Sequence, residues 1–142
     1  MTTPFQSPEI QAFATGFPVT LLHAGVTVAL LFAATTVYVL LTPHKEIALI
    51  RDGNSAAAVS LAGVMVGLAI PLAVSLKAST SLIELALWGA ATVLVQILIF
   101  RLVDLMLHGL PKRIQDGEMA AAAALVGAKL STALIFAAAV SG

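Results

Sequence analysis

Four long apolar segments dominate the sequence, and only short polar segments separate them. The apolar segments cover approximately residues 19–41, 55–76, 82–107 and 119–140. A helix needs roughly 20 apolar residues to cross a hydrocarbon core about 30 Å thick. Only 10% of the residues are charged, whereas a soluble domain carries roughly 25%, so the charged side chains are too few to cover a water-facing surface. The sequence therefore predicts an all-α membrane protein with four transmembrane helices.

The first apolar segment has a second interpretation as a signal peptide, which would need a basic n-region and a short apolar core. The only charged side chain before Gly16 is Glu9, and the apolar run that follows is long. We therefore expect a retained transmembrane helix, with Tyr38 near its far end as an interfacial aromatic residue. Ser7 and Pro8 are typical of an N-cap and a first helical position, although a frayed terminus is the alternative.

Basic residues are concentrated in two of the three segments that connect the apolar runs. Lys45 and Arg51 lie in the first connection, Lys112 and Arg113 lie in the third, and only Lys77 lies in the second. Loops rich in Lys and Arg stay on the cytoplasmic side of a membrane. We therefore expect both basic turns to be cytoplasmic and both termini to be extracytoplasmic.

A stretch of nine residues occurs twice, and each copy places an Asp-Gly turn before an alanine-rich apolar helix. The copies are residues 50–58 and 114–122, which are 64 positions apart. Both copies run in the same direction through the membrane, so we predict parallel hairpin repeats; a chance match in alanine-rich sequence is the alternative. We interpret each turn as a helix start, with Asp or Asn/Ser as the N-cap. The predicted domains are an extracytoplasmic N-terminal arm at 1–16 and helical hairpins at 17–78 and 79–142.

Two tandem hairpins, with Asp52-Gly53 and Asp116-Gly117 before the second helix of each, resemble the small YjfL-like inner-membrane proteins of bacteria, a family catalogued as a domain of unknown function. The resemblance covers roughly Val19 to Val140. It implies a four-helix fold in the bacterial cytoplasmic membrane. It supplies no catalytic residue and no substrate.

Small residues recur at four-residue spacing on three of the predicted helices. Gly63 and Gly67 form a GxxxG pair, Gly127 and Ser131 occupy the equivalent positions on the fourth helix, and Gly25 lies on the first. Such stripes let helix backbones approach closely within a membrane. They indicate either packing within one chain or a seam between chains, and because two hairpins make a small bundle we expect a homo-oligomer or a membrane-protein partner in the lipid bilayer.

Ionisable residues inside the predicted spans are candidates for a functional site. Arg101, Asp104 and His108 share one face of the third helix, with Gln96 on the same helix, and Lys129 lies in the middle of the fourth. Helical side chains lean towards the N-terminus of their own helix, which brings the side chains of Asp104 and Lys129 closer in depth. We expect these two to pair, with Arg101 sharing the carboxylate. Structural pairing or snorkelling of Lys129 is the alternative to a functional role.

Several function classes lack the residues that they need. The sequence has no cysteine, which excludes thiol catalysis and cysteine-ligated metal. Its histidines do not share a helix at ligand spacing, and neither a phosphate-binding loop nor a Ser-His-Asp set is present. No basic patch favours nucleic acid. We therefore expect no metal, no cofactor and no enzymatic activity.

The sequence favours a structural or accessory subunit of a homo- or hetero-oligomer. The alternative is an ion or proton pathway lined by Lys129, Arg101 and Asp104. A membrane enzyme is the least favoured of the three classes.

Overall fold

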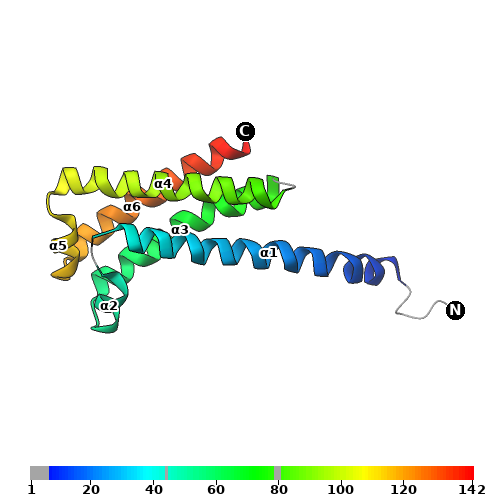
Figure 1. Cartoon of the computed structure of the whole chain (residues 1–142), viewed down its shortest axis with the longest axis horizontal. Coiled ribbons are helices and arrows are strands. Elements are labelled where there is room, and N and C mark those ends of the chain that lie inside the picture. Colours follow the sequence, from blue (N-terminus) through cyan, green and yellow to red (C-terminus); the bar gives the residue numbers. More distant parts are fainter. Residues whose placement is uncertain (1–6, 44, 79–80) are drawn as a thin grey trace.

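The computed structural model describes residues 7–43, 45–78 and 81–142, and these ranges contain helices but no strand (Figure 1). The helices are α1 (Pro8–Leu41), α2 (Glu46–Arg51), α3 (Ser55–Ala78), α4 (Leu82–Leu107), α5 (Leu110–Gln115) and α6 (Met119–Ser141). Four of them, α1, α3, α4 and α6, are long and apolar enough to cross a membrane. The predicted all-α class with four spans is confirmed.

Helix α1 begins where the sequence predicts a helix start. Ser7 is the N-cap and its hydroxyl accepts a hydrogen bond from the Ile10 N–H at 3.4 Å. The helix then runs without a break to Leu41, so residues 8–16 of the predicted arm are helical and continuous with the first span. Residues 1–6 of that arm lie outside the described residues, and so does residue 79, where the second predicted hairpin begins.

Helices α3 and α6 form the centre of the bundle, and they pack along each other more extensively than any other pair. A Cβ atom at Gly63 would lie 2.5 Å from Val126 Cγ2 of α6, and one at Gly67 would lie 3.0 Å from Gln96 Nε2 of α4. Packing within the chain therefore accounts for these two glycines. Helices α1 and α4 flank this pair, and the N-terminal part of α1 extends past the bundle (Figure 1).

The short helices α2 and α5 lie together at one end of the bundle, here called the turn end (Figure 1). Neither helix was predicted from the sequence, where both segments have the composition of polar turns. Each ends with a glycine at positive φ, Gly53 at 86° and Gly117 at 79°. The N–H of each glycine donates to a carbonyl three residues earlier at 3.0 Å, which is part of a Schellman-type helix end. The two turns therefore have the same backbone geometry. The duplication of whole hairpins stays a prediction.

The Asp-Gly dipeptides therefore end a helix, and the expected role of Asp as an N-cap is wrong. Asp52 and Asp116 are the C-caps of α2 and α5. The other expected cap is present, because Asn54 Oδ1 accepts a hydrogen bond from the Ala57 N–H at 3.0 Å. The same Asn54 side chain donates to the carbonyl of Gln115 at 2.9 Å, so it also joins the two turns.

Candidate functional site

Lys129 is fully buried inside the bundle although it carries an ionisable amine in the middle of α6. Its Nζ donates a hydrogen bond to Tyr38 Oη of α1. The same nitrogen lies 3.7 Å from the centre of the Tyr38 ring and 5.7 Å from the centre of the Phe100 ring. An ammonium group is attracted to the face of an aromatic ring at such distances. Lys129 is therefore held by α1 and α4 in addition to its own helix.

A buried carboxylate from α2 completes this cluster. Glu46 is the first residue of α2 and is fully buried. It lies close enough to Tyr38 and to Lys129 to interact electrostatically with both. A buried charge is costly unless an opposite charge lies near it, and Glu46 supplies that charge to Lys129. We call Tyr38, Glu46, Phe100 and Lys129 the lysine cluster.

Gln96 links the lysine cluster to the remaining long helix. Its side chain is fully buried, and Nε2 donates to the carbonyl oxygens of Gly67 and Lys129, each at 3.3 Å. The amide thereby ties α4 to both α3 and α6 near the middle of the bundle. Gln96 and Lys129 were predicted to belong to one network, and the structure brings these two residues together.

The other members of the expected charge network lie elsewhere. Asp104 Oδ1 accepts a hydrogen bond from the Leu110 N–H at 2.8 Å, which caps the start of α5. Arg101 and His108 are exposed. Among the described residues no ion pair joins Asp104 to Lys129, and Arg101 does not share the Asp104 carboxylate. The expected pair does not form. The Asp104 carboxylate instead binds the first N–H of α5, and the carboxyl group near Lys129 belongs to Glu46 of α2.

Sequence reasoning missed Glu46 as a site residue and assigned Tyr38 to the membrane interface, although Tyr38 is fully buried. One signal was available. At the 64-residue offset, Glu46 aligns with Leu110, an apolar residue, and Lys129 aligns with Met65. Each hairpin thus carries one ionisable residue where the other hairpin has an apolar one, and the two residues have opposite charge types.

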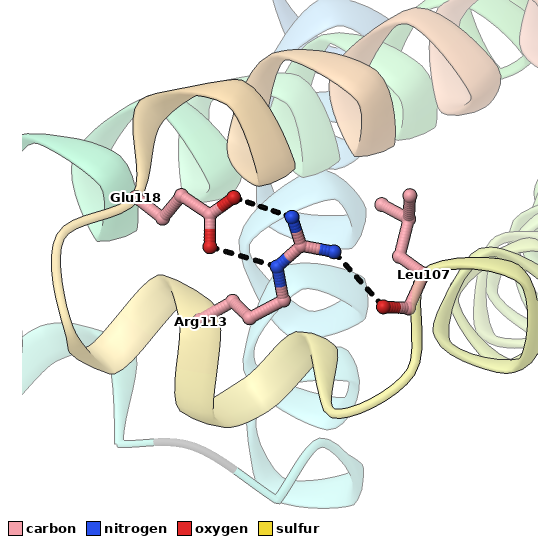
Figure 2. A network of polar contacts seen from close by, with 3 residues as sticks. All are labelled: Leu107, Arg113 and Glu118. Carbon is pink, nitrogen blue, oxygen red and sulfur yellow. Dashed lines mark hydrogen bonds and ion pairs between the residues drawn. The ribbon is translucent and has the colours of Figure 1, made fainter.

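A second polar cluster closes the turn around α5 (Figure 2). Arg113 Nε donates to Glu118 Oε2 at 2.7 Å, its Nη2 donates to Glu118 Oε1, and its Nη1 donates to the Leu107 carbonyl at 2.9 Å. These hydrogen bonds raise the pKa of the Arg113 guanidinium and lower the pKa of the Glu118 carboxyl. Both side chains are about one-third exposed. We call this ion pair the Arg113–Glu118 clasp, and it stabilises the turn locally.

Three of the predicted packing residues face outward. Open space surrounds the position of a Cβ atom at Gly127 and at Gly25. Ser131 is exposed, and its hydroxyl donates to the Gly127 carbonyl of its own helix at 2.7 Å. No other helix of the chain therefore packs against Gly25 or Gly127, in contrast to Gly63 and Gly67. The described residues also contain no group of three or more His, Asp or Glu side chains that fits a metal ion.

Comparisons with known proteins agree with a membrane location. The family described as "Domain of Unknown Function (DUF350)" matches residues 12–140. The protein named "UPF0719 inner membrane protein YjfL" of Escherichia coli K12 is 31% identical over 97 residues, which are 68% of this chain and 72% of that protein. The protein of the same name from Escherichia coli O157:H7 matches to the same extent. No solved structure matches the chain.

Proposed function

The chain belongs to the DUF350 family and is a multi-pass inner-membrane protein, and from this premise we propose that it is a structural or accessory subunit that assembles with further copies of itself. In this proposal the protein acts by packing within the membrane and has no catalytic role. The proposed partner is a second copy of the same chain.

The main support for this proposal is the outward face of α6. Gly127 aligns with Gly63 at the 64-residue offset. Gly63 is packed against Val126, whereas the space beside Gly127 is open. Ser131 already donates to its own helix, so it leaves no unpaired donor towards lipid or protein. The same small-residue pattern thus packs against a helix on α3 and lacks a neighbour on α6, which favours close approach of another helix there.

The lysine cluster supports a packing role over catalysis. Tyr38, Glu46 and Lys129 are each fully buried, so a substrate reaches their polar atoms only if a helix moves. The alternative, an ion or proton pathway lined by Lys129, Arg101 and Asp104, needs these side chains on one surface. Within a single chain Lys129 is buried and Arg101 is exposed, so the pathway ranks second.

In the membrane we propose that the turn end is cytoplasmic and that both termini are extracytoplasmic. The distribution of Lys and Arg supports this orientation. The chain has no cysteine, so Lys112→Cys and a cysteine added after Gly142 give two single-thiol probes. A membrane-impermeant maleimide applied to spheroplasts should label the C-terminal probe and spare Cys at position 112; the reverse pattern contradicts the proposed orientation.

Oligomeric state in mild detergent tests the proposed function. Gly127→Leu with Ser131→Leu should block the face and convert the oligomer into a monomer, as measured by size-exclusion chromatography with light scattering. Ala62→Leu is the matched control, because Ala62 is an exposed alanine on α3, and it should leave the oligomer intact. A wild-type chain that is strictly monomeric, or a double variant that assembles like the wild type, contradicts self-assembly through α6.

The competing pathway has its own test. Proton and cation flux across proteoliposomes is measured for the wild type and for Lys129→Met. The accessory role predicts flux no higher than in protein-free liposomes for both. Flux that is present in the wild type and lost in the variant favours the pathway instead.

A further inference from the structure

We propose that a groove between α1 and α4 binds an acyl chain of an anionic phospholipid and that Arg101 holds the phosphate of that lipid. This inference is independent of self-assembly through α6, since it concerns another face of the molecule.

The groove has a volume of about 360 Å³, and every side chain that lines it is apolar. Small residues open it on both sides. Its walls include Ala33, Ala34 and Val37 of α1 and Gly89, Ala90 and Val93 of α4. Because both helices are membrane spans, the groove faces the hydrocarbon of the bilayer, where acyl chains are the available apolar ligands.

The length of the groove matches one leaflet. At about 1.5 Å per residue, the α1 wall from Leu30 to Leu41 is ~16 Å long. Half of a hydrocarbon core of about 30 Å is ~15 Å. An extended acyl chain in one leaflet therefore follows the groove along most of its length. Leu41 is the last residue of α1, so the groove ends at the turn end, where the lipid headgroup would lie.

Arg101 stands at that end of the groove. It follows Ile97, a lining residue, by four positions on α4, so the two side chains share a face. Side chains of a helix lean towards its N-terminus, which directs Arg101 back along the groove. Arg101 is exposed, and it makes no hydrogen bond or ion pair with any residue that the structure describes.

The charge of Arg101 selects the ligand. The nearest carboxylate on its own face, Asp104, is engaged by the Leu110 N–H. A guanidinium at the edge of an apolar groove matches a phosphate, which it binds through two parallel hydrogen bonds. A zwitterionic lipid offers the same phosphate but also a cationic headgroup beside it, so a lipid of net negative charge is favoured.

Lipid-dependent melting of the purified, delipidated protein tests the charge. Phosphatidylglycerol should raise the melting temperature more than phosphatidylcholine does, and sodium phosphate alone should have no effect. Arg101→Gln should remove the difference between the lipids and weaken phosphatidylglycerol binding in native mass spectrometry about fivefold. Lys112→Gln removes another exposed cation of the turn end and should behave like the wild type.

Three outcomes overturn this assignment. Arg101→Gln retains the lipid difference, Lys112→Gln loses it to the same extent, or phosphate alone reproduces the shift and so marks a site for free anions. In each case Arg101 is not the lipid phosphate ligand.

A second set of variants tests the groove itself. Ala90→Leu and Ala33→Leu narrow it from opposite walls and should both reduce the number of lipids retained per chain. Ala62→Leu adds the same bulk to an exposed position on α3 and should retain lipid as the wild type does. Retention is measured on the fraction that elutes with the wild-type volume, so misfolded protein does not contribute. Full retention by both groove variants contradicts an acyl chain in the groove.

Discussion

Helices α2 and α5 have the same length and the same glycine-terminated end, yet they attach to the bundle by different physical means. The first residue of each is fully buried, but this residue is Glu46 in α2 and Leu110 in α5. Helix α5 adds a second fully buried apolar side chain, Ile114. Helix α2 packs Leu49 and Ile50 against the core only in part, and its one fully buried side chain is the carboxyl group of Glu46, which interacts electrostatically with Lys129.

Leu110 shows that an apolar side chain is compatible with the buried first position of such a short helix. Burying apolar surface stabilises α5 without desolvation of an ionisable group, whereas the attachment of α2 requires a carboxyl group and an amine to leave water together. The attachment of α2 therefore depends in part on an ionisable residue of α6, and that of α5 does not. This difference makes α2 the more easily released of the two helices.

The largest effect is expected from Lys129→Met, which introduces the residue found at the aligned position 65. The buried Glu46 carboxylate then loses the opposite charge of Lys129, and the variant should be destabilised by about 3–5 kcal/mol. Denaturation in mixed micelles measures this change. Proteolysis within 46–51 should accelerate, while 110–115 stays protected. Unchanged stability would mean that Lys129 does not compensate Glu46.

The double variant Glu46→Leu with Lys129→Met is the control, because it gives α2 the apolar docking of α5. Without an uncompensated charge it should unfold within ~1.5 kcal/mol of the wild type. A double variant as unstable as Lys129→Met alone would place the loss in packing around Tyr38 and Phe100 rather than in charge.

An intermediate effect is expected at the start of α5. Asp104 caps this helix through the Leu110 N–H at 2.8 Å, and loss of an N-cap costs about 1 kcal/mol. Asp104→Ala should therefore increase amide hydrogen exchange in 110–115, with little change in 46–51. Asp104→Asn retains a capping oxygen and should lie close to the wild type. If exchange in α5 is equal in all three proteins, the Asp104 cap does not stabilise α5.

The smallest effect is expected from pH at the Arg113–Glu118 clasp. Its hydrogen bonds lower the pKa of Glu118, so the clasp adds stability above the unfolded pKa of about 4.3, and that stability is lost as pH falls through the lower folded value. Exposed pairs contribute little. The protection factor of amides near 118, which corrects for the intrinsic pH dependence of exchange, should fall slightly below pH 4, and Glu118→Gln should show this lower protection at neutral pH. If acidification lowers the protection factor of Glu118→Gln by the same amount, the pH effect belongs to another group.

Local sequence was sufficient for features that depend on neighbouring residues. The four spans follow from the length and hydropathy of each segment. The caps at Ser7 and Asn54 follow from side chains that reach amides three residues ahead. The close packing at Gly63 follows from the absence of a side chain in a membrane helix.

The lysine cluster could not be predicted in this way, because Lys129 and Tyr38 are 91 residues apart. Depth along the helices placed Lys129 near Asp104, but it carried no information on which neighbouring helix the amine faces. Helix α2 was missed for a related reason. A helix of six residues is unstable alone, so its existence depends on docking to the rest of the bundle.

The sequence by itself determined that this chain spans a membrane four times, since hydropathy and helix length are properties of each segment. The tertiary structure alone decided that Lys129 belongs with Tyr38 and Glu46 and that Asp104 serves α5. Those choices depend on which helices become neighbours and on how each turn folds back. Partners of a buried charge are set by that arrangement in space, and no single segment contains it.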